Sequence, residues 1–179
     1  TYYVNDTFDT EGQNGNEVFS PAGTSILAGE YFMLNLHGFI GYFEGLQEVP
    51  YDITLNPPGG LKPYTSLQLV RTDGEGYTFR AGRYFEVTDN PIQVTAQEAV
   101  SIDLEDITVN LSVYSPGRQY KAADLKPAME RMMKAQKAFL GEIDGTDQYN
   151  ILLYLSTMQD DATGYEALEH HTSTVVVLP

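Results

Sequence analysis

The 179-residue sequence contains no cysteine and no tryptophan. The absence of cysteine excludes disulfide bonds and thiolate chemistry. It does not assign a compartment, because many exported proteins also lack cysteine. The sequence opens at Thr1-Tyr2-Tyr3 without a signal peptide, as a processed or truncated product would. The compartment stays unknown from the sequence, and an exported or periplasmic location is the hypothesis.

Basic residues are also scarce, with 10 Lys and Arg against 25 Asp and Glu, for a net charge of −15. An acidic surface of this kind opposes binding to nucleic acid and to anionic membranes. No apolar run approaches the roughly 20 residues that a membrane-spanning helix needs. The sequence therefore predicts neither a nucleic-acid partner nor a membrane span.

Apolar and aromatic residues are abundant enough to form a core: 42% of the residues are hydrophobic, and there are 13 Tyr and 8 Phe. Segments such as Tyr51–Leu55 and Ile107–Val113 alternate between apolar and polar residues, which is typical of half-buried strands. About eight short strands separated by Gly and Pro turns are predicted before Ser115, among them one through Phe85 and Val87, and no helix. This pattern predicts a mainly β fold that begins with an antiparallel β-sandwich.

The character of the sequence changes at Ser115-Pro116-Gly117. A helix is predicted from Asp124, as its cap, to Gly141, with Pro127 in the first turn. Its predicted apolar stripe consists of Leu125, Met129, Met132, Gln136 and Phe139. Buried strands over Asn150–Leu155 and Thr172–Leu178 follow, separated by a loop that includes Gln159–Gly164. We expect two domains, a sandwich over 1–115 and a helix with strands over 116–179 that opens a larger α+β domain.

The segment Gly164–Pro179 concentrates titratable groups in front of an apolar run. Glu166, Glu169, His170 and His171 precede Val175–Leu178, a run typical of a strand buried on both faces. Polar groups held at a strand entry suit a binding or catalytic edge. A solvated strand entry is the alternative interpretation.

Four segments in order resemble one family, the M61 metallopeptidases of the glycyl aminopeptidase group. Ala167-Leu168-Glu169-His170 with Ser173 resembles its Gly-Leu-Glu-His…Ser signature. Pro21–Gly45 and Tyr84–Ile92 are similar to its N-terminal β domain, and Asp124–Gly141 is similar to the first helix of its thermolysin-like catalytic domain. The chain departs from the family in lacking H-E-x-x-H, the zinc-binding motif, and in carrying Glu166-Ala167 where Gly-Gly is usual.

The resemblance implies an internal fragment of a zinc aminopeptidase, with no metal ligand and no catalytic residue of its own. Zinc is expected in the full-length parent, and the expected partners are a peptide substrate and the rest of the catalytic domain. In related aminopeptidases an edge strand pairs with the substrate, and a Glu on it holds the free α-amine. The implied substrate-binding residues are therefore Glu169 for the amine, Ala167 and Leu168 for backbone pairing, and His170, whose role stays unassigned.

Three further expectations depend on the sequence. Strand edges left unpaired by truncation favour a homo-oligomer. The main alternative function is a β-sandwich module that binds a glycan or a protein, which predicts a cluster of exposed aromatic residues. A third hypothesis is a self-sufficient enzyme that uses Glu166, Glu169 and His170, but the sequence offers it neither a set of metal ligands nor a nucleophile.

Overall fold

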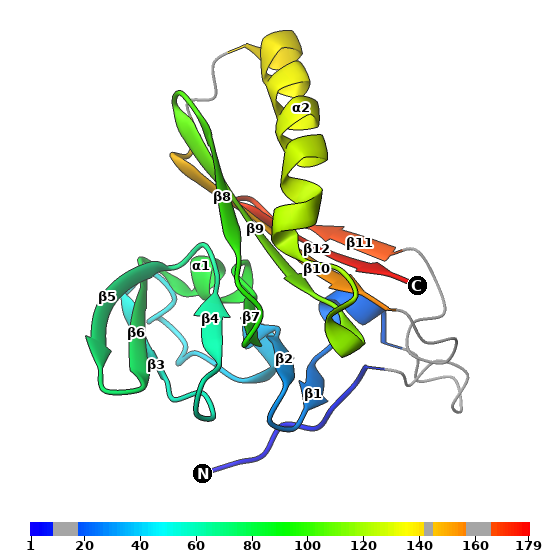
Figure 1. Cartoon of the computed structure of the whole chain (residues 1–179). Coiled ribbons are helices and arrows are strands. Elements are labelled where there is room, and N and C mark those ends of the chain that lie inside the picture. The colour runs from blue at the N-terminus through cyan, green and yellow to red at the C-terminus, as the bar shows by residue number, and fades with distance from the viewer. Residues whose placement is uncertain (9–17, 142–144, 157–165) are drawn as a thin grey trace. The chain divides into compact units, whose positions relative to one another are not determined.

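The computed structural model describes residues 1–8, 18–141, 145–156 and 166–179 (Figure 1). Within these residues the chain is mainly β, with antiparallel pairing and one long helix that is followed by further strands, which confirms the predicted fold class. The chain divides into two compact units, Thr1–Ala96 and Gln97–Pro179, which we call unit 1 and unit 2. The predicted loop at Gln159–Gly164 lies outside the described residues.

Unit 1 is built from two antiparallel sheets, with strand orders β1-β2-β7-β4 and β3-β6-β5. Leu34 and Val94 of the first sheet and Phe79 and Ala81 of the second belong to one buried core. The two sheets therefore pack face to face, as in a sandwich. The strands are β1 (Ser25–Leu27), β2 (Tyr31–Leu34), β3 (Tyr51–Leu55), β4 (Lys62–Tyr64), β5 (Gln68–Asp73), β6 (Gly76–Ala81) and β7 (Ile92–Thr95).

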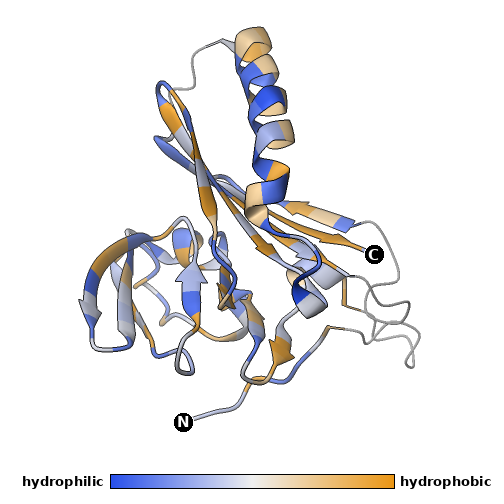
Figure 2. Cartoon of the chain, viewed as in Figure 1, coloured by the Kyte–Doolittle hydropathy of each residue, from blue (hydrophilic) through white to orange (hydrophobic). Residues whose placement is uncertain are grey.

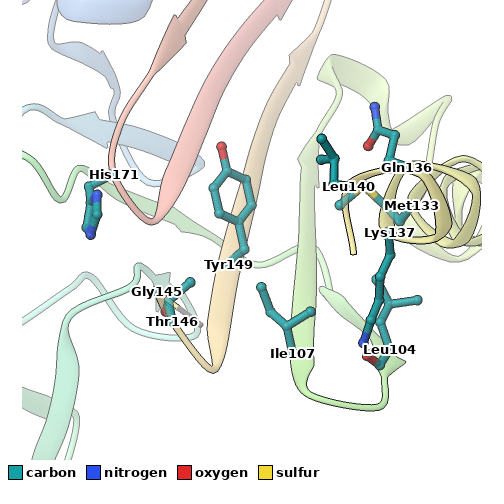
Figure 3. Close-up of a pocket in the computed structure, with 10 residues that line it drawn as sticks. All are labelled: Leu104, Ile107, Met133, Gln136, Lys137, Leu140, Gly145, Thr146, Tyr149 and His171. Carbon is teal, nitrogen blue, oxygen red and sulfur yellow. Dashed lines mark hydrogen bonds between the residues drawn. The ribbon is translucent and has the colours of Figure 1, made fainter. Parts of the chain in front are cut away.

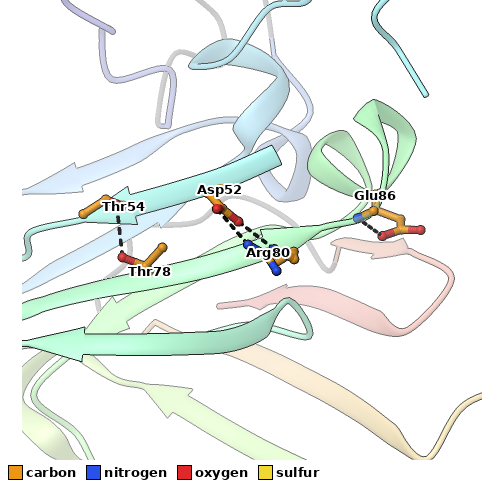
Figure 4. A network of polar contacts seen from close by, with 6 residues as sticks. Asp52, Thr54, Thr78, Arg80 and Glu86 are labelled. Atoms are coloured by element: carbon orange, nitrogen blue, oxygen red, sulfur yellow. Dashed lines mark hydrogen bonds and ion pairs between the residues drawn. The ribbon is translucent and has the colours of Figure 1, made fainter. Parts of the chain in front are cut away.

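The outer face of the second sheet is polar. Asp52 on β3 lies opposite Arg80 on β6 and accepts two hydrogen bonds from its guanidinium, of 2.7 and 2.9 Å (Figure 4). The bond from Arg80 lowers the pKa of the Asp52 carboxyl. Next to this pair, the hydroxyls of Thr54 and Thr78 lie 3.1 Å apart. The predicted half-exposed strand at Tyr51–Leu55 is confirmed, since its even-numbered side chains are exposed and its odd-numbered ones are half-buried.

Residues Tyr84–Thr88 form the short helix α1, so the predicted strand through Phe85 and Val87 is wrong. Val87 is fully buried while Phe85 is 53% exposed, whereas a strand would place both side chains on one face. The carboxylate of Glu86 accepts a 2.6 Å hydrogen bond from the backbone N–H of Gly82 (Figure 4), and the side chain of Asn90 donates to the carbonyl of Glu86. These bonds favour a helical turn that two apolar residues in alternation do not reveal.

The described residues of unit 2 form one five-stranded sheet of order β11-β12-β10-β9-β8. Its strands are β8 (Val100–Leu104), β9 (Ile107–Tyr114), β10 (Gln148–Leu155), β11 (Glu166–Glu169) and β12 (Ser173–Leu178). The three central strands run parallel, and the two outer strands pair antiparallel with their neighbours. Since β9 and β10 are parallel, a crossover must join them, and helix α2 (Ala122–Leu140) supplies it.

The division between the units falls at Ala96–Gln97, earlier than the 115–116 boundary that the sequence predicts. The difference has a physical cause: β8 and β9 pair with each other, and β9 pairs with β10 along its length. The alternation of Ile107–Val113 indicates a strand but not its partner. The change from strands to helix near Pro116 therefore occurs inside unit 2.

One face of the unit 2 sheet forms a core with α2. The odd-numbered apolar residues of β9, from Ile107 to Val113, share this core with Ile102 on β8 and with Ile151 and Leu153 on β10. Figure 2 shows apolar residues concentrated along these central strands, while α2 is mixed. The terminal strand β12 alternates between buried and half-buried residues, so the expectation of full burial on both faces holds only for the face of Val175 and Val177.

Helix α2 begins two residues before the predicted cap. Lys121 is the N-cap, Asp124 lies in the first turn, and Pro127 is inside the helix. An interior proline removes one backbone hydrogen bond without preventing the helix. Gly141 ends the helix as predicted, with a φ of +87° that favours glycine. No helix among the described residues is long and apolar enough to cross a membrane.

The apolar stripe of α2 differs from the predicted one. Leu125, Met129 and Met133 pack on the unit 2 core at four-residue steps. Met132 is 44% exposed and Phe139 is 88% exposed, so both were wrongly assigned to the core. Because a four-residue step and a three-residue step turn in opposite senses around the helix, a stripe of mixed steps is ambiguous in sequence.

Candidate functional site

The segment that the sequence singles out forms an edge strand. β11 is the last strand of the unit 2 sheet, and among the described residues nothing pairs with its outer side. Glu169 and Ala167 on β11 are exposed, whereas Glu166 and Leu168 are half-buried. A strand at a sheet edge presents unpaired backbone groups that an extended peptide can join.

The register decides which backbone groups face the open edge. The N–H of His170 donates a 2.8 Å hydrogen bond to the carbonyl of Ser173, so these residues form a hydrogen-bonded pair that closes the β11–β12 turn. Antiparallel strands alternate between bonded and non-bonded pairs. Leu168, opposite Val175, is therefore directed toward β12. Ala167 and Glu169 turn their N–H and C=O groups outward.

The side chain of Glu169 lies on the same face of the sheet as α2. Glu169 is opposite Thr174, which in turn is opposite Ile151, a member of the core under α2. Glu166 lies three residues earlier on the strand and therefore projects from the other face. The two carboxylates of β11 are thus separated by the sheet.

The two adjacent histidines have different surroundings. His170 is half-buried, with its Nε2 atom buried, while His171 is exposed and lines a pocket. His171 and Thr172 form the turn between β11 and β12, where Asn150 donates its backbone N–H to the carbonyl of Thr172 over 3.0 Å. The β11–β12 turn is therefore fixed to the central strand β10.

A pocket of about 280 Å³ opens beside this turn, between the C-terminal half of α2 and the sheet (Figure 3). Its wall is mostly apolar, with a few polar side chains. The pocket is lined by Leu104, Ile107, Met133, Gln136, Lys137, Leu140, Gly145, Thr146, Tyr149 and His171. Burial raises the pKa of the Tyr149 hydroxyl, and the negative charge of Glu169 raises it further. Tyr149, which lines the pocket, therefore interacts electrostatically with Glu169, the exposed carboxylate on the edge strand β11.

Lys137 fixes the end of α2 over the pocket. Its ammonium donates to the carbonyl of Leu104 over 2.6 Å and pairs with the carboxylate of Asp106. Both acceptors lie at the β8–β9 turn, where Glu105 adopts a φ of +64°. In the last turn of α2, the charge of Lys137 also complements the negative end of the helix dipole. Nothing in the apolar periodicity or charge spacing of the sequence predicts the ion pair with Asp106, which is 31 residues away.

The side chains of the described residues do not fit a zinc site. No group of three His, Cys, Asp or Glu side chains comes together there. Structural and catalytic zinc sites need three or four such ligands at about 2 Å. Zinc therefore has no part in the chemistry that we derive for this chain.

The comparisons with known proteins bear on the family. The model of the Peptidase M61 N-terminal domain matches residues 1–96. The chain belongs to this family. The resemblance drawn from the four sequence segments is thereby confirmed at the level of the family. No curated protein sequence matches the chain.

Two solved structures have a similar fold. An aminopeptidase N family protein from Idiomarina loihiensis is 19% identical, with a TM-score of 0.72, and the match covers 86% of this chain and 26% of that one. Native yeast LTA4 hydrolase is 17% identical, with a TM-score of 0.51, and the match covers 82% of this chain and 23% of that one. The M61 chain therefore spans about a quarter of the length of these proteins. At this identity the likeness shows the fold alone.

Proposed function

We propose that this chain is the N-terminal portion of an M61 aminopeptidase, in which β11 pairs with an extended peptide and Glu169 binds the α-ammonium. The observation that supports it is the position of Glu169, which is exposed on the open edge strand. Outward backbone groups at Ala167 and Glu169 bind any sequence, and a carboxylate facing an ammonium sets the register from the N-terminus. Reaction chemistry is left to the expected remainder of the catalytic domain.

The surroundings of Glu169 suit this role. Burial raises the pKa of the Tyr149 hydroxyl, and the charge of the Glu169 carboxylate raises it further, so the two groups interact. A tyrosine hydroxyl, with an ordinary pKa of about 10, is neutral at physiological pH. A neutral phenol donates a hydrogen bond without competing for the substrate's positive charge. The turn at His171 and Thr172, fixed to β10, keeps the end of β11 in place. Glu169 is thus a charged group on a rigid support.

The test compares free and blocked peptides. A free-amine tripeptide and its N-acetyl form are titrated into the isotope-labelled chain, and the backbone amide resonances of Ala167 and Glu169 are followed. An ammonium–carboxylate hydrogen bond contributes roughly 1.5–3 kcal/mol, so Glu169→Gln should weaken binding of the free peptide by about ten- to a hundredfold. Binding of the acetylated peptide should stay as it was.

Glu166→Gln is the matched control, because it removes a carboxylate from the other face of the same strand. It should leave the preference for free peptides unchanged. Equal losses with both peptides would show that Glu169 supports the fold and does not bind the amine. In the full-length enzyme the same substitution should lower kcat/KM for free-amine peptides alone.

The expected homo-oligomer stays a prediction. The open side of β11 remains the surface on which it would form. The alternative of a sandwich binding module predicts a cluster of exposed aromatic residues. Unit 1 has such a cluster, and it supports a separate binding role.

A further inference from the structure

Exposed aromatic side chains in unit 1 occur on α1 and on the segment 42–46, whose Tyr42 contacts Tyr84 of α1. Phe43 is 80% exposed, Phe85 53% and Tyr42 51%, and Leu46 beside them is 47% exposed. The ring of Tyr84 lies 4.8 Å from that of Tyr42 and 5.8 Å from that of Tyr51, measured between centroids. We call Tyr42, Phe43, Leu46, Tyr84 and Phe85 the aromatic patch. Exposed patches of large apolar residues mark interaction sites.

The patch is held in a fixed shape by hydrogen bonds to the backbone of residues 39–49. The hydroxyl of Tyr84 donates to the carbonyl of Ile40 over 2.7 Å, and its backbone N–H donates to Gln47 over 2.7 Å. The hydroxyl of Tyr51 donates to Leu46 over 3.1 Å. Gly45, with a φ of +83°, allows the turn in which the N–H of Leu46 bonds to Phe43. Aromatic side chains presented rigidly lose little entropy on binding.

Charge around the patch points to the kind of partner. Residues 39–49 contain two glutamates, Glu44 and Glu48, and no lysine or arginine. Both glutamates are exposed. The nearest cation is Arg83, which pairs with Glu48 and Glu86 at 3.9 Å. Acidic side chains among aromatic rings repel anionic lipid and a second copy of this acidic chain, and they attract cations.

Arg83 shows how the patch accommodates a cation. Its guanidinium carbon lies 5.3 Å from the centroid of the Phe85 ring, within the range of a cation–π contact. The same guanidinium faces the carboxylate of Glu48. The ring of Tyr42 contacts that of Tyr84, and Phe43 and Glu44 follow Tyr42 directly in the sequence. This segment therefore also brings aromatic residues and a carboxylate together, without an arginine of its own.

We infer that the aromatic patch of unit 1 binds a basic peptide segment, whose Arg or Lys side chains stack on Phe43 and Tyr42 and pair with Glu44 and Glu48. Guanidinium groups stack on aromatic faces and form bidentate bonds with carboxylates, so arginine is the better ligand. The inference depends on unit 1 alone and is independent of the role of Glu169. It assigns the M61 N-terminal domain a recognition function for polypeptides.

The experiment measures fluorescence anisotropy of a labelled peptide in which three arginines alternate with glycine and serine. The control peptide carries citrulline at the three positions, which keeps the shape and removes the charge. At about 0.15 M ionic strength the Debye length is about 8 Å, so attraction to the overall charge is screened. The arginine peptide should bind at least about tenfold more tightly than the citrulline peptide, since each contact contributes about two- to fivefold.

Matched variants separate the patch from the general acidity of the chain. Phe43→Ala and Glu44→Gln should each weaken binding about two- to fivefold. Phe139→Ala removes a similarly exposed phenylalanine from unit 2. Glu75→Gln removes an exposed carboxylate at the β5–β6 turn, the end of β6 remote from α1. Both controls should bind as the unchanged chain does. Thermal unfolding followed by circular dichroism confirms that each variant folds.

Three results overturn the inference. Equal affinity for the two peptides, or no binding of either, would show that the patch does not recognise the positive charge of arginine. Losses in the Phe139→Ala and Glu75→Gln controls as large as those in the patch variants indicate diffuse attraction. Self-association in sedimentation analysis that Phe43→Ala abolishes would show that the patch is occupied by a second copy.

Discussion

The two units cover their sheets in different ways. In unit 1 two sheets bury a common core between them, with Phe79 and Val94 from opposite sheets. In unit 2 the single sheet has α2 on one face, and among its elements α2 contacts β8 and β9. The strip formed by β11 and β12 on that face remains half-buried or exposed, and it carries Glu169. The sandwich thus buries its central strand β7 completely and, among the described strands, leaves only the edge strand β5 fully exposed. A sheet with one crossover helix leaves a wider strip of one face open, which gives room for a site.

The largest effect is expected from truncating one leucine in each unit, a buried one in unit 2 and an exposed one in unit 1. Leu111 on β9 is fully buried in the unit 2 core, and Leu69 on β5 is 50% exposed. Leu111→Ala should lower the free energy of unfolding by about 2–5 kcal/mol, because it removes buried surface and leaves a cavity. Leu69→Ala should cost less than about 1 kcal/mol. Urea unfolding measures both, and similar losses would show that the unit 2 core is poorly packed.

A smaller effect is expected from the contact that holds the end of α2. Lys137→Met removes the bonds to Leu104 and Asp106 and should cost about 1–3 kcal/mol, since hydrogen bonds to charged groups contribute that much. Lys134→Met, one turn earlier, breaks an exposed pair with Glu130 and should leave the stability almost unchanged, because solvent screens such pairs. Urea unfolding again compares the two. If both variants are equally stable, apolar packing alone holds the helix.

The smallest effect sharpens the comparison through two tyrosines, one in each unit. Burial raises the pKa of Tyr84 in unit 1 and of Tyr149 in unit 2, and Glu169 contributes only to Tyr149. Each folded-state pKa is above the unfolded value of about 10, so the stabilisation is present below that pH and is lost as the pH rises through the folded-state pKa. Tyr149→Phe should therefore reduce the loss of stability in alkaline solution.

Glu169→Gln separates the two tyrosines. It should lower the pKa of Tyr149 and leave that of Tyr84 unchanged, as measured by ultraviolet titration of Tyr→Phe variants that isolate each hydroxyl. A common shift of both tyrosines would mean that Glu169 acts through the fold and not through its charge.

Local patterns in the sequence predicted several elements correctly. The alternation at Tyr51–Leu55 and Ile107–Val113 matches β3 and β9, and the Asn150–Leu155 run lies in β10. Gly141 ends the helix as expected. The segment around Glu169 was singled out from its titratable groups and its resemblance to the family. Each of these signals is contained within a few residues, where steric preference and burial act on neighbours in the chain.

Other features depended on side-chain hydrogen bonds and packing contacts that apolar periodicity does not reveal. The α1 turn replaced a predicted strand because Glu86 and Asn90 bond to nearby backbone. Met133 replaced Met132 in the core because the residues of α2 that pack on it, Leu125, Met129 and Met133, recur at four-residue steps. Neither the ion pair of Lys137 with Asp106 nor the pocket at Tyr149 could be predicted from the spacing of residues in the sequence.

The sequence by itself determined the mainly β class, the position of the helix and the acidic character of this M61 chain, because composition and periodicity are local properties. The tertiary structure alone decided that β9 pairs with β10, that β11 lies at the edge with Ala167 and Glu169 turned outward, and that Tyr42 packs against Tyr84 of α1. Strand alternation states which side chains share a face but not which strand lies alongside. Pairing is fixed only when the whole sheet buries its apolar faces together.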